Sequence, residues 1–260
     1  MVTQNVMKQS SRIVQLAIWC AALVVATTLS AQVRYRVSGG LSTMWITSDN
    51  PAVERIASMD TTKPFGGSLD GSQIGWGIRC YADLDKQKTL RIPFGIDLHM
   101  LSGTQSVTAP TYVAKAQHDV NIWTVHAGFE YAVVEFPLAF ARGYVAGELR
   151  GAFVGQSNIT KTLRTLDGQT GKIVTTVEEF SEKPSVFRLG AMARVGIEGE
   201  LYYPLFLNTS VGYGILNLFL RDDQPTPAGR GELLTPTRIS EPQEGMLQQL
   251  NFTFMLQVRL

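Results

Sequence analysis

The sequence predicts an all-β fold, an eight-stranded antiparallel up-and-down barrel with long loops at one end and short turns at the other. Three observations predict it. Eight stretches alternate apolar and polar residues, the two-residue period of a strand. Their connections alternate between long and short along the chain. The last stretch, 249–260, ends the sequence, and such a strand avoids a bare edge by pairing with the first one and closing the barrel.

Residues 1–31 have the features of a secretory signal peptide. Lys8 and Arg12 supply positive charge, residues 13–26 are apolar, and small residues follow up to Ala31, where cleavage is expected. The alternative is an anchor helix that stays attached. The domain organisation expected is therefore a signal peptide, 1–31, followed by one barrel domain, 32–260. Cys80 is then the one cysteine left, so the fold is expected to stand without a disulfide.

The strand stretches show the alternation clearly. Phe187 and Leu189 flank Arg188, for example, and Phe252 and Phe254 fall two residues apart in the last stretch. The fifth stretch is weaker and rich in glycine, and the seventh loses its parity after residue 215, which predicts a bulge there. The eight strands are expected at 33–45, 73–84, 90–101, 120–132, 139–154, 185–201, 205–219 and 249–260.

The connections place all long loops at one end. Long segments, 46–72, 102–119, 155–184 and 220–246, alternate with short ones, 85–89, 133–138 and 202–204. Within the third long segment, 159–166 and 173–180 are extended and threonine-rich, and Asp167-Gly168 lies in the turn between them. This hairpin is expected to continue the fifth and sixth strands beyond the barrel.

Three features favour a transmembrane barrel over a soluble sandwich. The first is strand length, because eleven or more residues exceed the usual soluble strand and suffice to cross a bilayer at a tilt. The second is an aromatic girdle, two belts at opposite ends of the strands. The girdle residues are Trp45, Trp76, Trp123 and Phe187 near the loop ends, and Tyr35, Tyr131, Phe140, Tyr202, Tyr203 and Phe206 near the turn ends.

The third feature is the polar face, which parity predicts to point into the lumen. It carries nearly balanced bases and acids, and its bases are arginines rather than lysines, which suits paired charges in a narrow interior. The expected lumen network is Arg34, Arg36, Arg79, Asp83, Arg91, Asp97, His99, His126, Glu130, Glu148, Arg150, Arg188, Arg194, Glu198, Glu200 and Arg259.

The signal peptide, strand pattern and terminal strand resemble small eight-stranded bacterial outer-membrane β-barrels of the OmpA/OmpX type, which are porin-like in architecture. The resemblance covers nearly the whole mature chain as architecture. It implies that Phe252, Phe254, Leu256, Val258 and Leu260 form the signal read by the barrel-assembly machinery, with Leu260 in place of the usual terminal aromatic. It also implies localisation in the bacterial outer membrane, with outer-membrane lipid and lipopolysaccharide as partners.

No catalytic, cofactor or metal site is predicted. His118 with Ser102 and Ser106 is the only loop group that could act as base and nucleophile, and it is a weak signal for a catalytic site. A net charge of +1 gives no nucleic-acid footprint. The expected function is therefore non-enzymatic, either structural or surface-binding through long extracellular loops whose ligand the sequence does not identify, with a plugged lumen. The alternatives are a lipid-modifying enzyme on the same barrel, or a soluble periplasmic β-sandwich.

Overall fold

In the computed structural model of this chain, the described residues are 34–47, 50, 52, 69, 73–85, 87–137, 140–167, 170, 172–224, 231–234 and 244–260. The predicted signal peptide, 1–31, lies outside them. No helix among the described residues is long and apolar enough to span a membrane. The described strands are β1 (Tyr35–Thr47), β2 (Gln73–Asp83), β3 (Leu90–Ala109), β4 (Tyr112–Phe136), β5 (Ala141–Val154), β6 (Ser157–Leu166), β7 (Ile173–Lys183), β8 (Val186–Tyr202), β9 (Leu205–Phe219) and β10 (Gln248–Arg259).

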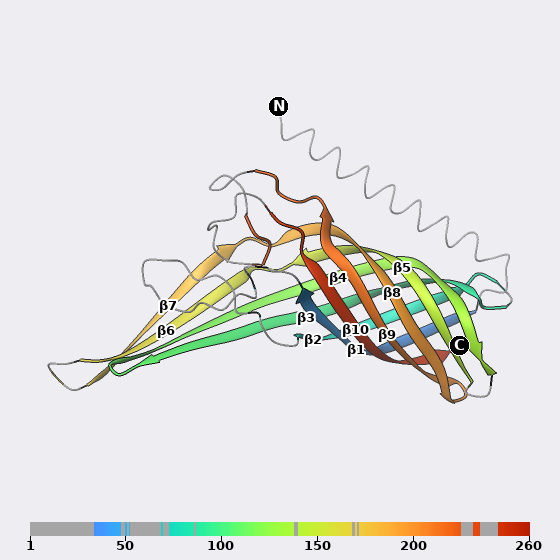
Figure 1. The fold of residues 1–260 in the computed structure, drawn as a ribbon, viewed down its shortest axis with the longest axis horizontal. Helices are drawn as coiled ribbons and strands as arrows, with labels where there is room; N and C mark the ends of the chain where they lie inside the picture. The colour runs from blue at the N-terminus through green and yellow to red at the C-terminus, as the bar shows by residue number, and fades with distance from the viewer. Residues whose placement is uncertain are drawn as a thin grey trace.

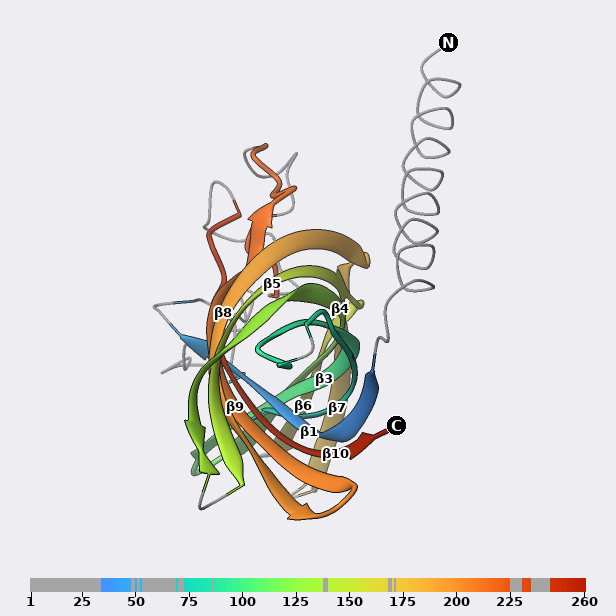
Figure 2. The ribbon, with the colours of Figure 1, turned by 90° about the vertical axis from the view of Figure 1, so that its right-hand side faces the viewer.

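Eight of these strands close into one antiparallel barrel. The ring runs β1-β2-β3-β4-β5-β8-β9-β10, with β3 paired to β4 and β10 paired to β1 (Figures 1 and 2). At the closing seam Arg36 lies opposite Arg259 and Thr47 lies opposite Gln248. The predicted barrel, and the pairing of its last strand with its first, are confirmed. The sandwich alternative is wrong, because one sheet closes on itself.

A flat sheet continues from the barrel at the loop end. The predicted hairpin is present as β6 and β7, and β6 also pairs with the first half of β4, where Tyr112 lies opposite Thr165. Together with the outer parts of β3 and β4, these strands form a four-stranded extension, β3–β4–β6–β7, that projects well past the barrel (Figure 1).

The expected loop at 102–119 is a correction, because these residues are strand. β3 runs on to Ala109 and β4 begins at Tyr112, with only a tight turn between them. Its threonines and valines suit strands, but one of its two faces carries mostly small residues, such as Ala114 and Ala116, in place of large apolar ones. Since the prediction relied on apolar alternation, it stopped both strands at the point where the alternation stops.

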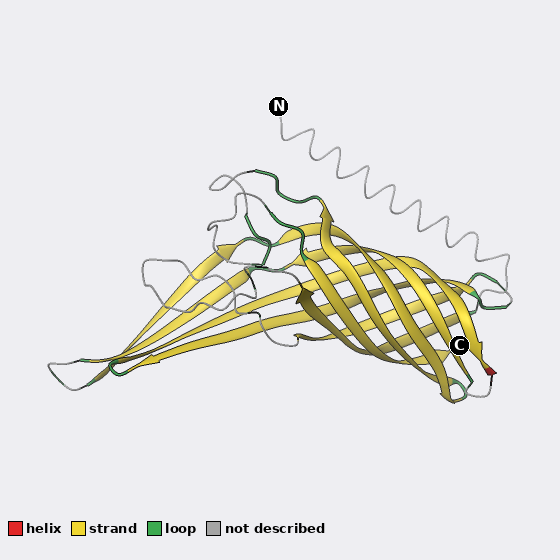
Figure 3. Ribbon diagram, in the orientation of Figure 1, coloured by secondary structure: helices red, strands yellow, loops and turns green. Residues whose placement is uncertain are grey.

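The short connections gather at the opposite end, as predicted (Figure 3). In the turn between β2 and β3, the Asp85 carboxylate accepts hydrogen bonds from the backbone N–H groups of Thr89 (3.1 Å) and Leu90 (2.9 Å). The predicted bulge in the seventh barrel strand is also confirmed. Register with β8 shifts by two residues after Ile215, so that Leu216 and Asn217 are both buried.

Glycines on the inner wall make room for the large side chains that fill the lumen. Gly77 on β2 lies opposite Asp97 on β3, and a Cβ at Gly77 would meet Asp97 Oδ1 at 2.2 Å. Gly196 on β8 lies opposite Tyr144 on β5, and a Cβ there would meet the tyrosine ring at 2.4 Å. These two large inward side chains therefore each lie across a glycine of the neighbouring strand, which lets them pack into the narrow interior.

Candidate functional site: the lumen, the outer wall and the loop-end mouth

The outer wall of the barrel is apolar and exposed. Leu149, near the middle of β5, is 70% exposed. Across five strands, Trp76, Leu98, Trp123, Phe153 and Phe187 are successive register partners, which forms a continuous outward row. The rings of Phe153 and Phe187 are 4.6 Å apart. An exposed row of this kind needs an apolar environment outside the barrel.

The structure places the predicted girdle residues on this wall with one exception. Phe206 is buried and lies under the Arg259 guanidinium, 4.2 Å from its ring centroid, so its assignment to a belt is wrong. Phe153 was missed, although it has the same parity as its neighbours on β5. The outward residues at the two ends are Trp45, Trp76, Trp123, Tyr35, Tyr131, Phe140, Tyr202 and Tyr203, with Phe187 partly covered by Phe153.

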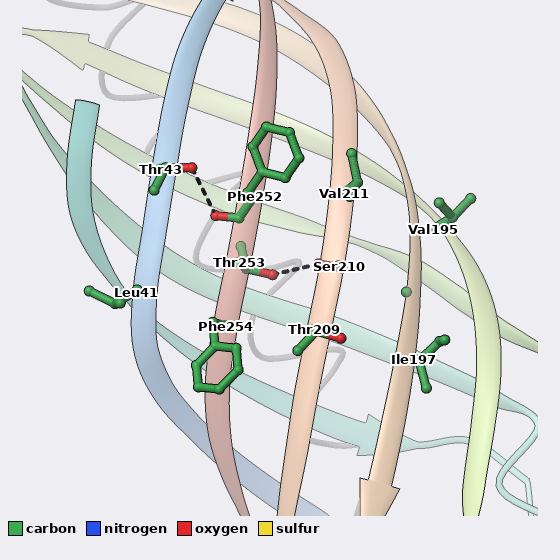
Figure 4. Close-up of a pocket in the computed structure, with 11 residues that line it drawn as sticks. Leu41, Thr43, Val195, Ile197, Thr209, Ser210, Val211, Phe252, Thr253 and Phe254 are labelled. Carbon is green, nitrogen blue, oxygen red and sulfur yellow. Dashed lines mark hydrogen bonds between the residues drawn. The ribbon is translucent and has the colours of Figure 1, made fainter. Parts of the chain in front are cut away.

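The residues of the proposed assembly signal also point outward. Phe252, Phe254, Leu256, Val258 and Leu260 are all exposed along β10. Two of them, Phe252 and Phe254, border an apolar groove of about 580 Å³ on the outer wall (Figure 4). Its opposite border is formed by Val195 and Ile197 of β8. The terminal strand thus contributes an apolar outer surface while its alternate residues face the lumen.

The half of the lumen nearest the short turns holds one balanced cluster of buried charges. Glu198 accepts hydrogen bonds from Arg36 Nη1 (2.5 Å) and Arg91 Nη1 (2.6 Å). Asp83 pairs with Arg36 at 3.1 Å, Glu130 pairs with Arg91, and Arg142 reaches Glu198 at 3.4 Å. Three arginines therefore face three carboxylates, so the cluster is neutral.

A second cluster lies further toward the loops. Glu148 pairs with Arg79 (3.1 Å) and Arg194 (3.0 Å), and Asp97 pairs with Arg150 (2.7 Å) and Arg79 (3.4 Å). Two histidines border it. His126 Nε2 lies 3.7 Å from Asp97 Oδ2, and His99 Nε2 lies 3.2 Å from the Ser42 hydroxyl. Because these side chains come from strands around the whole ring, the cluster ties the walls of the barrel together.

The loop-end mouth is closed by a hydrophobic core. Loop residues Ala52, Leu69, Leu233 and Leu234 are buried against inward aliphatic side chains of the strands. Glu232 joins the two loops, because it accepts a hydrogen bond from Asn50 Nδ2 at 3.1 Å and another from the Leu234 backbone N–H at 2.7 Å. The strand residues of this plug are Met44, Ile46, Leu101, Val120, Ile122, Ala152, Val154, Leu216 and Leu247, the last directly before β10.

Beside the plug, Arg188 anchors the last long loop. Its guanidinium donates to both carboxylate oxygens of Glu244, with distances of 2.5 to 3.1 Å. Glu244 also accepts from Asn217 Nδ2 (2.7 Å) and from the backbone N–H of Asp222 (3.1 Å). The two ends of this loop are thereby fixed to each other and to β8.

Most of the predicted lumen residues are buried and meet in these groups. They are Arg36, Arg79, Asp83, Arg91, Asp97, His99, His126, Glu130, Glu148, Arg150, Arg188, Arg194 and Glu198. Arg34 and Glu200 are corrections, because they lie at strand ends and are exposed. Arg259 is half-buried at the turn-end mouth. Parity could have found Arg142, which lies on the same face of β5 as Glu148, and Tyr81, which lies on the same face of β2 as Arg79.

Comparison with known proteins gives structural likeness only. No family model and no curated protein matches this sequence. Among solved structures, Ail, the attachment invasion locus protein of Yersinia pestis, in complex with the heparin analogue sucrose octasulfate, is similar at 9% identity and a TM-score of 0.41, covering 88% of this chain and 100% of Ail. Neisserial surface protein A is similar at 10% identity and a TM-score of 0.40, covering 88% of this chain and 98% of that protein. The barrel described above rests on the strand register and burial of this chain.

The weak candidate for chemistry does not assemble. His118 points to the inner face of the extension and is buried, whereas Ser102 and Ser106 point to the outer face. The one close serine–histidine pair described, Ser42 with His99, is fully buried in the lumen. Within the described ranges no group of three potential metal ligands occurs.

Proposed function

We propose that this chain is a bacterial outer-membrane β-barrel protein that acts without catalysis, in an envelope or surface-binding role, and that its lumen is plugged. The observation that carries the proposal is the inverted distribution of side chains. Thirteen of the predicted charged and histidine side chains are buried inside the barrel, while tryptophan, phenylalanine and leucine cover its outside. A soluble barrel would bury the second set and expose the first. A hydrocarbon surrounding explains both.

The four-stranded extension is the part best suited to binding at the cell surface. Its outer face is flat and rich in hydroxyl groups, with two cations, Lys115 and Arg164, among them. Apolar side chains gather near its tip, where Ile173 is 71% exposed. The same face also carries Thr104, Ser106, Thr108, Gln117, Thr162 and Thr175, together with Val113, Val177 and Asp119. A hydroxyl-rich sheet with an apolar tip supports binding to another macromolecule outside the membrane.

Membrane insertion is tested on the full chain expressed with its N-terminal segment. We expect the protein in the outer-membrane fraction, soluble only with detergent, and running at a different gel position after boiling than before it. Recovery from the periplasm as a detergent-independent monomer would refute the proposal.

Orientation is tested by cysteine labelling on intact cells with a membrane-impermeant maleimide. The native Cys80 is partly buried. A Cys80→Ser background removes its signal. We expect Thr175→Cys, in the extension, to react on intact cells, and Gln87→Cys, in a short turn, to react only after lysis. The reverse result would place the extension in the periplasm and remove the surface-binding role.

A plugged lumen should not let solutes pass. Two buried charge clusters and a hydrophobic core lie in series along the lumen. We expect no conductance above background in planar bilayers. Steady single-channel currents would show that the lumen is open and would refute this part of the proposal.

A further inference from the structure

A pocket of about 460 Å³ lies at the turn-end mouth of the barrel, opposite the plug. It is lined from the short turns and from the ends of β4, β5, β8, β9 and β10. Three cations border it, Lys88, Arg142 and Arg259, and two carboxylates, Glu135 and Glu200, lie on its rim.

The cations carry donors that the protein leaves unused. Arg142 donates from Nη1 to the carbonyl of Lys88 at 2.5 Å, but its Nε is buried and has no hydrogen-bond partner. Arg259 stacks on Phe206, and its Nε is likewise buried and unpartnered. A buried donor without a partner costs free energy. Because both Nε atoms are closed to solvent, a ligand in the pocket would reach them only after these side chains turn toward it.

Several cations lie close to Lys88 at this end of the barrel. Burial lowers the pKa of the Lys88 ammonium, and the nearby guanidinium groups of Arg259, Arg36 and Arg34 lower it further. Glu198 also lines the pocket, but Arg36 and Arg91 already engage it at 2.5 and 2.6 Å. Of the three mouth cations Glu198 reaches Arg142, at 3.4 Å, so Lys88 and Arg259 are the two that no described contact pairs with it.

The two rim carboxylates distinguish this pocket from a simple anion site. Glu135 and Glu200 are exposed, and a purely anionic ligand would be repelled by them. A ligand that also carries an ammonium group would meet both kinds of charge favourably.

We propose that the turn-end pocket binds a small zwitterion, with a phosphate or carboxylate group against Lys88, Arg142 and Arg259 and an ammonium group against Glu135 and Glu200. Phosphoethanolamine has this chemistry, either free in solution or as the headgroup of a phospholipid. The exposed rings of Phe136 and Phe140 on the rim would contact the tails of such a lipid. The proposal rests on the proposed function only in placing the pocket on the periplasmic side of the membrane.

The test is calorimetric titration of the purified full-length mature protein, folded in detergent, with phosphoethanolamine and separately with inorganic phosphate. We expect phosphoethanolamine to bind and to bind more tightly than phosphate. Arg259→Gln and Lys88→Asn are each expected to weaken it about tenfold or more, the scale of one charge-assisted hydrogen bond. Asparagine is chosen because Lys88 has a φ of 60°, which asparagine tolerates. Lys172→Gln, an exposed lysine in the β6–β7 turn, is the matched control and should change nothing.

A Glu135→Gln, Glu200→Gln double variant isolates the ammonium contacts. It should reduce the preference for phosphoethanolamine over phosphate while phosphate binding stays or improves. Equal binding of the two probes by the unaltered protein, or binding that survives both cation variants, would overturn the proposal, and so would no heat signal with either probe.

Nanodiscs separate the two sources of the ligand. If the site takes a lipid headgroup, discs of phosphatidylethanolamine should block the titration and discs of phosphatidylcholine should not. If the ligand is a soluble zwitterion, the titration should be the same in both. Folding and gel mobility are measured on the same samples, so failure of the membrane assignment would be seen separately from failure to bind.

Discussion

Replacing Glu198 by glutamine tests whether paired charges hold the lumen together. Glu198 accepts from Arg36 and Arg91 at 2.5 and 2.6 Å, and from Arg142 and Gln257 at 3.4 and 3.2 Å. Glutamine keeps the size of the side chain and one acceptor oxygen but removes the charge. Three buried arginines would then face two carboxylates.

The expected loss of stability follows from that imbalance. Removing one partner of a buried ion pair costs about 3–5 kcal/mol, because the other charge stays buried without compensation. Two short charge-assisted hydrogen bonds, worth about 1.5–3 kcal/mol each, give about 3–6 kcal/mol, which overlaps this range. We therefore expect Glu198→Gln to lower the free energy of unfolding by about 3–5 kcal/mol.

The assay is urea unfolding in lipid vesicles, followed by tryptophan fluorescence and by gel mobility without boiling. Glu200→Gln is the matched control, because Glu200 lies two residues further along β8 and is exposed. Its effect should stay within about 0.5 kcal/mol. Equal unfolding midpoints for the two variants would refute the reasoning. Adding Arg142→Gln to Glu198→Gln restores neutrality and should recover a measurable part of the loss.

Three further predictions concern the wall, the inner glycines and a turn. Leu149→Arg should lower the free energy of unfolding in vesicles by about 2–4 kcal/mol, the cost of a cation facing lipid near the bilayer midplane. A barrel surrounded by water would tolerate the arginine. Unfolding is measured with Leu149→Ala as the reference variant. Gly77→Ala should destabilise the barrel by displacing Asp97, while Gly147→Ala, where a Cβ meets nothing within 4 Å, should not, and thermal unfolding compares them. Burial alone would raise the pKa of Asp85, but hydrogen bonds within its turn outweigh burial and lower it. Its contribution to stability is therefore present above the unfolded pKa of about 3.9 and is lost as pH falls through the lower folded pKa. Asp85→Asn should remove that loss in an unfolding series from pH 6 to pH 2.

The barrel strands could be predicted because the outer wall is apolar and the lumen is filled with charged side chains, so alternate residues must differ in polarity. Arg188 between Phe187 and Leu189 shows this, since the structure buries the arginine and leaves both neighbours at least partly exposed. This difference in polarity is required only along the part of each strand that faces the filled lumen and ends near the strand ends. Arg34 and Glu200 have the parity of lumen residues, but they lie near strand ends, outside the filled lumen, and are exposed.

The β3–β4 part of the extension was not predicted, because the alternation of large apolar and polar residues ends where these two strands leave the barrel. Along residues 102–119 one parity is polar and the other carries small residues such as Ala114 and Ala116, so the segment has little alternation of large apolar residues to detect. Only the β6–β7 hairpin was predicted there, because Asp167-Gly168 gave a turn signal between two threonine-rich segments. The turn between β3 and β4 has no Asp-Gly or Asn-Gly pair, so its only signals are Pro110 and the β-branched residues on either side of it.

The loop-end plug shows why the two ends of the lumen are filled by different chemistry. At the turn end the connections are short, so wall side chains fill the lumen there and opposite charges on different strands neutralise one another. At the loop end the chain leaves the strands and can fold back, as Leu233 and Leu234 do, so aliphatic side chains meet as in a soluble core. Met44 and Ile46 on either side of Trp45 reveal the change in the sequence, because both faces of β1 become apolar there. A run in which alternation gives way to apolar residues on both faces therefore marks the depth at which loop residues enter a barrel.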